Sequence, residues 1–197
     1  MIPVSSRVLK PEPAAFDEKC RKKGAEWLAR NPKASRKAKR PKNLWSPFRT
    51  ALASAFSDLC AYGAMYEPNG TVDHFKPVDA DELLAYEWHN YRYVTGWINS
   101  SKNKRPKVLD AFQVKPGWFE VLLPSLQLVA VKANIPSKLH ALVDQTLECL
   151  HLVDDERVVR QRREWLRMYD EKEIDLIGLT KKAPMIAAAV RKRDGIA

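Results

Sequence analysis

The feature that most constrains the fold of this 197-residue chain is a run of turn, strand and helix signals near its middle. Glu67–Gly70 has strong turn chemistry, and the stretch 71–75 after it predicts a short strand. A polar and aromatic loop follows, and residues 91–97 then alternate in polarity like a second strand. A short helix is expected from Asn99, and it must end near Pro106, because proline disfavours a helical conformation at the residue before it. The expected order is therefore strand, long loop, strand, short helix.

The side chains that could carry chemistry lie at the ends of these elements. Asp73 and His74 close the first strand, Asn90 lies in the loop, and Asn99 begins the short helix. Hydrolysis of a phosphodiester at neutral pH needs a base for water and a cation on the scissile phosphate. An imidazole beside oxygen ligands offers that combination, and Asn90 can hold the loop by bonding its backbone. Because neighbouring strand residues point to opposite faces, the strand must bend or end at Asp73 and His74 for both to serve one site.

With these elements in place, the chain resembles the HNH endonuclease family, whose ββα-metal fold has the same order of elements. The resemblance covers 60–104, and the matching residues are Asp73-His74 with Pro77, Asn90, and Asn99-Ser-Ser-Lys102. It implies that His74 is the general base and that Asp73 and Asn99 bind a divalent metal ion. It also implies that Asn90 orders the loop that orients His74. Taken singly, these residues have ordinary structural roles in hydrogen bonds, turns and caps, and only their combined spacing favours a nuclease.

A basic surface is expected to hold the substrate. The chain has 34 Lys and Arg against 24 Asp and Glu, a net charge of +10 that favours a polyanionic partner, although a merely soluble basic protein has the same imbalance. The stretch 30–42 is dense in Lys and Arg without acidic residues, which suits either a phosphate backbone or an exposed linker. The residues expected to contact nucleic acid are Lys102, Lys104, Arg105, Arg36, Lys37, Lys39 and Arg40. Lys102 could instead cap the loop.

Many HNH proteins carry two CxxC pairs that form a structural zinc site around the core. The matching places here are Cys60-Ala-Tyr-Gly63 and Thr95-Gly-Trp-Ile98. Three of the four thiols are absent, so no structural zinc is expected, and packing by Tyr62, Trp97 and their neighbours is expected to replace it.

The predicted fold class is α+β, with a ββα-metal core at about 60–106 embedded in flanking α-helices. The flanking elements are expected at 14–30, 44–62, 137–151 and 154–169 as helices, and at 119–131 as strand pairing around Pro124. The expected regions are 1–43 (arm, weak helix and basic linker), 44–135 (nuclease core with the preceding helix and following strands) and 136–197 (helical region). Residues 1–13 are expected to form a mobile arm and the last seven residues to fray. The arginines of the last predicted helix form either a phosphate-facing surface or a solvated face.

The flanks also resemble HNH effectors of bacterial anti-phage systems, including Septu-type and retron-linked nucleases that act beside an ATPase. This wider resemblance implies a defence effector with a partner ATPase. The expected reaction is hydrolysis of DNA, with RNA left open, and the expected ion is Mg²⁺ with Mn²⁺ as a substitute. The rival hypothesis is a catalytically silent HNH-fold module that binds nucleic acid or serves as an adaptor for a partner protein.

The cellular location follows from cysteines and apolar stretches. Cys20, Cys60 and Cys149 are far apart and odd in number, which argues against a disulfide framework and for a reducing cytoplasm. The apolar stretches are too short to span a membrane, and the N-terminal sequence lacks the apolar core of a signal peptide. A cytoplasmic protein without membrane association is therefore expected.

Overall fold

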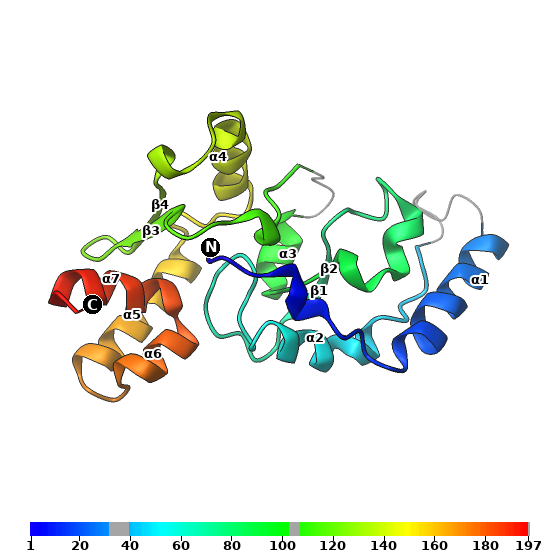
Figure 1. The fold of residues 1–197 in the computed structure, drawn as a ribbon, viewed down its shortest axis with the longest axis horizontal. Coiled ribbons are helices and arrows are strands. Elements are labelled where there is room, and N and C mark those ends of the chain that lie inside the picture. The colour runs from blue at the N-terminus through cyan, green and yellow to red at the C-terminus, as the bar shows by residue number, and fades with distance from the viewer. Residues whose placement is uncertain (32–39, 103–106, 197) are drawn as a thin grey trace.

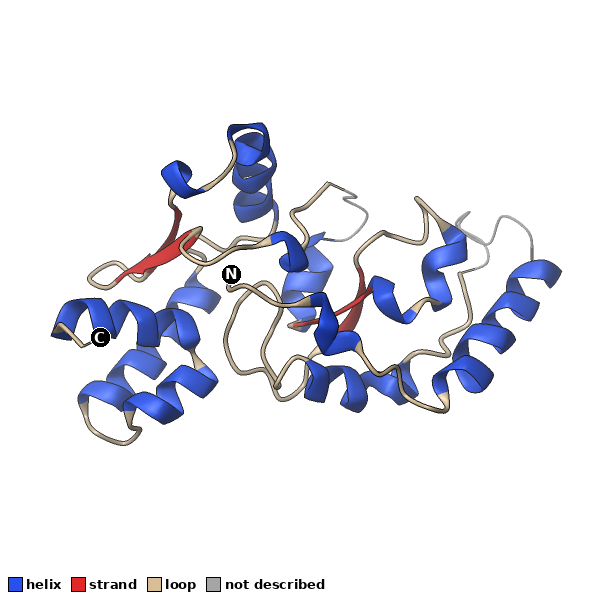
Figure 2. Cartoon of the chain, in the orientation of Figure 1, coloured by secondary structure: helices blue, strands red, loops and turns tan. Residues whose placement is uncertain are grey.

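The computed structural model describes residues 1–31, 40–102 and 107–196. It shows a mixed α+β protein, elongated along one axis, in which helices surround two small antiparallel sheets (Figure 1; Figure 2). The strands are β1 (Thr71–His74), β2 (Tyr91–Val94), β3 (Phe119–Leu122) and β4 (Gln127–Ala130). The α-helices are α1 (Lys23–Arg30), α2 (Arg49–Ala55), α3 (Gly96–Lys102), α4 (His140–Cys149), α5 (Glu156–Asp170), α6 (Leu176–Lys182) and α7 (Pro184–Asp194). Short 3₁₀ turns lie at Ser6–Leu9, Ser46–Phe48, Glu82–Tyr86, Trp88–Asn90, Ala111–Gln113, Lys132–Asn134 and Ser137–Leu139.

The two strands predicted around the central loop are present as an antiparallel pair, β1 and β2. In their register His74 lies opposite Tyr91, and Asp73 lies opposite Arg92. Residues directly opposite each other in an antiparallel pair point to the same face of the sheet. The register therefore gives each of the two predicted site residues a specific neighbour.

The helix after β2 starts earlier than the sequence suggested. β2 ends at Val94 and α3 begins at Gly96, so Asn99 lies inside the helix instead of at its start. The Asn99 N–H donates to the Thr95 carbonyl over 3.0 Å, which closes a helical turn before Asn99. The alternating pattern predicted a strand that extends to Trp97. Trp97 instead belongs to α3, where its ring packs against the guanidinium of Arg157 in α5.

Two predicted N-terminal helices have different lengths from those expected. The helix at 14–30 is present as a π-helical turn that leads into α1. The helix at 44–62 is shorter, because α2 ends at Ala55. Ser57 and Asp58 have φ angles of 54° and 56°, a left-handed conformation that cannot continue a right-handed helix.

The C-terminal part contains α4 and α5 where helices were predicted, and β3 and β4 form the predicted hairpin around Pro124. It also contains two helices that the sequence did not predict, α6 and α7. Pro184 stands in the first turn of α7, where proline is tolerated. Fraying was expected from residue 191, but α7 continues to Asp194. The Arg193 guanidinium also donates to the Asp170 carboxylate of α5 over 2.8 Å.

The N-terminal segment is packed and does not form the mobile arm that its prolines suggested. Met1 is 2% exposed and Leu9 is 5% exposed. The Trp88 indole N–H donates to the Leu9 carbonyl over 3.0 Å, which joins this segment to the loop before β2. Burial of Met1 and Leu9 in the core outweighs the local preference of the prolines for an open chain.

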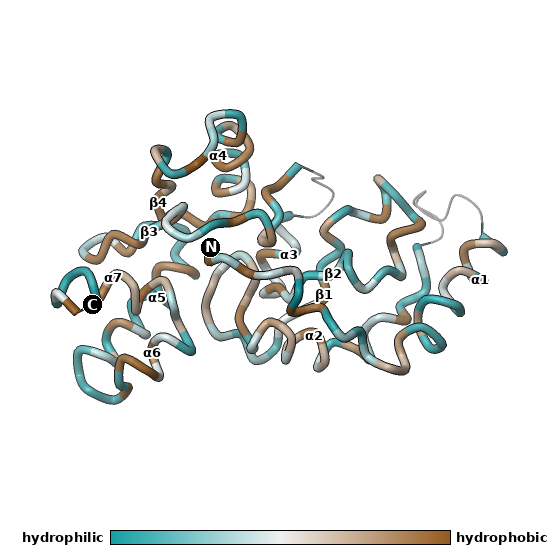
Figure 3. Tube along the Cα trace, in the orientation of Figure 1, coloured by the Kyte–Doolittle hydropathy of each residue, from teal (hydrophilic) through white to brown (hydrophobic). Residues whose placement is uncertain are grey.

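One hydrophobic core runs through the molecule, with buried residues from α2, both sheets and α7. Hydrophobic and hydrophilic residues are mixed along the helices, and none forms a continuous apolar span (Figure 3). Within the described ranges, no helix has the length and apolarity needed to cross a bilayer.

Candidate functional site

Asp73 and His74 end β1, and their side chains leave the strand toward opposite faces. On one face Lys102 of α3 donates to both carboxylate oxygens of Asp73, each over 2.8 Å. On the other face the His74 ring packs between the rings of Trp45 and Tyr91, at centroid distances of 4.6 and 5.1 Å. The strand ends at this pair, but the two side chains still point to opposite faces and have no common hydrogen-bond partner among the described residues.

The His74 ring is held in a defined orientation and tautomer. Its Nε2 lies 2.8 Å from the Ala85 carbonyl oxygen. A carbonyl can only accept, so Nε2 carries the proton and, in the neutral ring, Nδ1 has the free lone pair. Burial lowers the pKa of His74 below its ordinary value of 6.5, although the Ala85 bond and the Asp73 charge act in the opposite direction. The imidazole is therefore neutral at pH 7 and can accept a proton at Nδ1.

Asn90 ties the long loop together next to this imidazole. Its Oδ1 accepts from the Lys76 N–H over 2.8 Å, and its Nδ2 donates to the Lys76 and Leu84 carbonyls over 3.0 and 3.1 Å. Asn90 is 3% exposed, so these bonds satisfy an amide that burial would otherwise penalise. Leu84 precedes Ala85, whose carbonyl receives the His74 bond. Asn90 thus fixes the loop segment that orients His74, in the position where the sequence placed it.

Lys102 forms a buried ion pair with Asp73. Besides the carboxylate, its Nζ donates to the carbonyls of His74 and Phe75 over 2.7 and 3.0 Å. Lys102 is 1% exposed and Asp73 is 4% exposed. Burial lowers the pKa of Lys102, and the Asp73 carboxylate opposes that change. The sequence left two roles open for Lys102, a phosphate contact and a cap on the loop. Its contacts hold the end of β1 and the start of the loop, and a phosphate contact would require Lys102 to leave Asp73.

Asn99 lies one turn before Lys102 and contacts the start of β1. Its Nδ2 donates to Thr71 Oγ1 over 2.9 Å and to the Val72 carbonyl over 3.4 Å. Its Oδ1 has no hydrogen-bond partner among the described residues. Thr71 and Asp73 share one face of β1, because they are two residues apart in a strand. Thr71 and Asp73 are about 7 Å apart along β1, and α3 contacts the first through Asn99 and the second through Lys102.

The donor chemistry of this face suits a hard divalent cation. Asp73 supplies a carboxylate and Asn99 an uncommitted carboxamide oxygen, which are ligand types that Mg²⁺ and Mn²⁺ prefer. The described ranges contain no set of three His, Cys, Asp or Glu side chains placed to hold a metal ion together. The residues fit the ion in kind, while the Lys102 ammonium already neutralises Asp73.

Several neighbours of the site were missed in the sequence. Tyr91 and Arg92 follow from the register, since they lie opposite His74 and Asp73. The Arg92 guanidinium pairs with Asp110 over 2.7 Å and lies 3.8 Å from the Phe112 ring centroid. Pairing of the two strands could have indicated the first two residues. Trp45 had no sequence signal, because it is distant in the chain and reaches His74 only through the tertiary fold.

The four positions that the resemblance aligned with the zinc-binding pairs of many HNH proteins come together. The Gly63 and Thr95 N–H groups both donate to the Cys60 sulfur, over 3.3 and 3.4 Å. A β-carbon placed on Gly63 would lie 3.4 Å from Cys60 Sγ and 3.5 Å from Ile98 Cδ1. The two segments that the resemblance aligned with paired ligands thus meet at a single point, which is filled by a sulfur and apolar atoms.

The expected nucleic-acid contacts are only partly within the described residues. Arg36, Lys37, Lys39, Lys104 and Arg105 lie outside them. Arg40 is exposed. Two residues further on, the Tyr86 hydroxyl donates to the backbone carbonyl of Lys42 over 2.9 Å. The described end of the basic stretch therefore reaches the loop that carries Ala85.

The arginines of α5 have different roles from one another. Arg162 is 2% exposed and donates to three backbone carbonyls, so the suggestion that it faces phosphate is wrong. Arg157 pairs with Asp155, and Arg167 pairs with three glutamates. Arg160 and Arg163 are exposed and have no ion pair within the described ranges.

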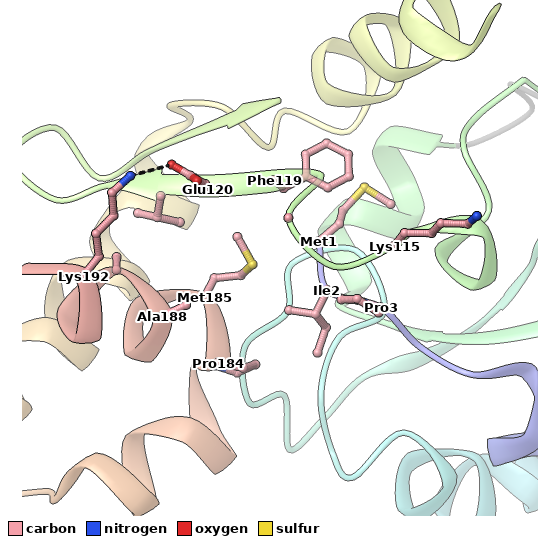
Figure 4. A pocket seen from close by; sticks show the side chains of 13 residues that line it. Met1, Ile2, Pro3, Lys115, Phe119, Glu120, Pro184, Met185, Ala188 and Lys192 are labelled. Carbon is pink, nitrogen blue, oxygen red and sulfur yellow. Dashed lines mark hydrogen bonds and ion pairs between the residues drawn. The ribbon is translucent and has the colours of Figure 1, made fainter. Parts of the chain in front are cut away.

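A separate apolar cavity of about 280 Å³ lies between the N-terminal segment, β3 and α7 (Figure 4). Met1, Phe119 and Met185 line it, and Lys192 pairs with Glu120 at its rim over 3.2 Å. Of the predicted site residues that the structure describes, none lines this cavity. Comparisons of the chain with protein-family models, with curated proteins and with solved structures found no match in any of the three.

Proposed function

We propose that this protein is a metal-dependent endonuclease of the HNH type, with a ββα-metal core formed by β1, β2 and α3. The observation that carries the proposal is the anchored imidazole of His74. Its Nε2 is committed to the Ala85 carbonyl, which leaves Nδ1 as the basic atom of a neutral ring at a strand end. The proposal also uses the adjacent Asp73 carboxylate, the loop that Asn90 orders and the carboxamide oxygen of Asn99 on the next helix.

Two further arrangements support the assignment. Asn90 bonds both ends of the loop between the strands, which is the role that the family resemblance gave it. Cys60, Gly63, Thr95 and Ile98 converge on one point, as expected if they replace the paired ligands of zinc-bearing relatives. Both arrangements join segments that are distant in sequence, so local propensity does not account for them.

In the proposed reaction, His74 accepts a proton at Nδ1 from the attacking water. The Ala85 carbonyl holds the protonated Nε2 and favours the imidazolium that results. Asp73 and Asn99 would hold a divalent cation, Mg²⁺ or Mn²⁺, which supplies positive charge to offset charge on the phosphate. His74 and Asp73 leave β1 toward opposite faces, so the proposed reaction requires the end of β1 and the loop after it to bring the imidazole and the ion to one phosphate.

DNA is the proposed substrate, with RNA as the alternative that the same assay tests. The exposed Arg40 and the described end of the basic stretch lie beside the loop that holds His74, where they can contact a phosphate backbone. A role as an anti-phage effector with a partner ATPase is part of the proposal. In that case cleavage by the isolated chain is weak and rises when the ATPase is added.

A second candidate function is a catalytically silent module that binds nucleic acid or a partner protein. The ion pair between Asp73 and Lys102 favours it, because a neutralised carboxylate is a poorer metal ligand. Both candidates predict binding to nucleic acid, and only the first predicts hydrolysis.

Cleavage of supercoiled plasmid and of labelled RNA, with Mg²⁺ or Mn²⁺, distinguishes the two. The wild-type protein should cut, and His74→Ala should lower the rate about 10²–10⁴-fold, because the general base is lost. His89→Ala is a matched control, since His89 is exposed in the same loop and should not matter. Equal rates for wild type and His74→Ala would contradict the assignment of the base. Binding without hydrolysis in all three proteins would favour the silent module.

A further inference from the structure

The Lys102 ammonium sits in an all-oxygen environment that resembles a cation site. Four oxygens lie 2.7–3.0 Å from Nζ, two from the Asp73 carboxylate and two from the carbonyls of His74 and Phe75. Carboxylate and carbonyl oxygens are also the donors used for hard metal ions. The side chain is 1% exposed, so this ammonium is held within the fold and is not a surface charge.

No other cation neutralises Asp73 among the described residues. The nearest buried cation on the same face of the sheet, Arg92, is already committed to Asp110 through two hydrogen bonds of 2.8 and 2.7 Å. Asp73 and Lys102 therefore form a closed pair with a net charge of zero. A buried carboxylate without a partner is unfavourable, so Asp73 requires one cation or another.

A divalent ion at Asp73 would compete with Lys102 directly. Asn99 and Lys102 are three residues apart on α3, so the two side chains lie on one face of the helix. The ammonium contacts both carboxylate oxygens, which leaves neither free of a cation. An ion with two positive charges bound to the same carboxylate would repel the ammonium at contact distance.

We propose that the Lys102 ammonium and the divalent ion are alternative occupants of Asp73, so that metal loading requires Lys102 to withdraw. The inference rests on the proposed function for the identity of the ion. Withdrawal also breaks the bonds of Nζ to the His74 and Phe75 carbonyls. Metal loading is thereby coupled to the backbone that carries the general base, and Lys102 sets the metal affinity of the site.

The first test compares Mn²⁺ binding by wild type, Lys102→Met and Lys76→Met in titration calorimetry. Lys102→Met keeps the length of the side chain and removes the charge, so it should bind Mn²⁺ at least about tenfold more tightly. Lys76→Met is the matched control, because it removes an exposed charge three residues from Asp73, and its affinity should stay within about threefold of wild type. Mn²⁺ should also raise the melting temperature of Lys102→Met more than that of wild type, since the ion replaces the missing partner of Asp73.

The second test uses the wild-type chain and does not depend on the folding of a variant. Lysine acylation followed by mass spectrometry should leave Lys102 unmodified in EDTA and modify it at saturating Mn²⁺. Lys76 should react equally in both conditions. Continued protection of Lys102 at saturating Mn²⁺ would overturn the proposal, and so would a Lys102→Met affinity equal to or weaker than that of wild type.

Failure of this proposal and failure of the proposed function give different results. Metal-dependent cleavage that is sensitive to His74→Ala, with Lys102 still protected, rejects the competition and keeps the nuclease. Absence of cleavage together with absence of Mn²⁺ binding in both the wild type and Lys102→Met rejects both. Tight binding by Lys102→Met without cleavage by any variant keeps the competition and rejects the nuclease.

Discussion

At the scale of single residues, the imidazole at the end of β1 is fixed through a short chain of bonds. The His74 ring bonds the Ala85 carbonyl, and Asn90 bonds the preceding carbonyl of Leu84. The same Asn90 closes the other end of the loop at Lys76 by donating and accepting one bond each. All three bonds come from the buried amide of Asn90. The orientation of His74 therefore depends on Asn90, although no hydrogen bond between described residues joins the two side chains.

Replacement of Asn90 tests this dependence. Asn90→Ala leaves the Leu84 carbonyl and both backbone groups of Lys76 without their partner, so the free energy of unfolding should fall by about 1–3 kcal/mol. Asn90→Asp keeps the acceptor but turns a carboxylate oxygen toward two carbonyls, so it should not restore stability. Urea denaturation measures both. A change below about 0.5 kcal/mol for Asn90→Ala would contradict the role of the amide in the loop.

At the scale of elements, α5 shows how a helix start is tied to the candidate core. Asp155 caps α5 by accepting from the Arg157 N–H over 3.0 Å. The same carboxylate bonds the Arg157 guanidinium twice, each over 2.8 Å. That guanidinium lies 4.0 Å from the Trp97 ring centroid in α3. One acidic residue therefore supports both the helix and its contact with the helix that carries Asn99 and Lys102.

Asp155 should contribute to stability in a pH-dependent way. Asp155→Ala removes the cap and should lower the free energy of unfolding by about 1 kcal/mol, whereas Asp155→Asn keeps a capping oxygen and should lower it less.

Hydrogen bonds from Arg157 lower the pKa of Asp155 to about 2. A carboxyl with a lowered folded-state pKa stabilises the fold above its ordinary value of 3.8, and this contribution is lost as the pH falls through about 2. The stability difference between wild type and Asp155→Asn should therefore shrink between about pH 4 and pH 2, which denaturation at each pH measures. A difference that is constant over this range would contradict the ion pair.

Local patterns predicted the elements with strong signals and failed where tertiary contacts decide. The turn before β1, the two alternating strands and the spacing of Asn90 placed the central loop correctly. The helix predicted from residue 154 begins at Glu156 and is capped by Asp155, since either of the two adjacent acidic residues could cap it. α6 and α7 were missed because the alanines of α7 are apolar on several sides and give no clear helical stripe.

The faces that side chains occupy could not be predicted from the sequence. Alternation shows that Asp73 and His74 diverge, but only the packing of α3 shows which side Asp73 takes. The ion pair with Lys102 depends on α3 starting at Gly96, three residues earlier than expected. The contact of Trp45 with His74 depends on the fold of the N-terminal region around the loop. The sequence singled out Asp73, His74, Asn90 and Asn99, and the structure shows the partners of each.

At the scale of the whole molecule, only some of the basic side chains behind the net charge of +10 are free to contact a polyanion. Many cations are committed, such as Arg162 to backbone carbonyls and Arg167 to three carboxylates. Arg160 and Arg163 are exposed on α5 without an ion pair within the described ranges. Only uncommitted charges release counterions on binding a polyanion, so the count of basic residues overstates the strength of phosphate binding.

Replacement of the two uncommitted arginines tests whether α5 contacts the nucleic acid of the proposed function. The affinity of the wild type for double-stranded DNA should fall steeply with salt, with a slope of about −0.9 in log–log form for each phosphate contacted. Arg160→Gln combined with Arg163→Gln should make that slope shallower by about 1.8 if both contact phosphate, and should weaken binding equally for unrelated sequences. Arg167→Gln is the matched control, because its guanidinium is already paired within the helix surface, and its slope should equal that of wild type. Fluorescence anisotropy over a salt series measures all three proteins. An unchanged slope for the double variant would remove α5 from the binding surface and leave the region around Arg40 to account for it.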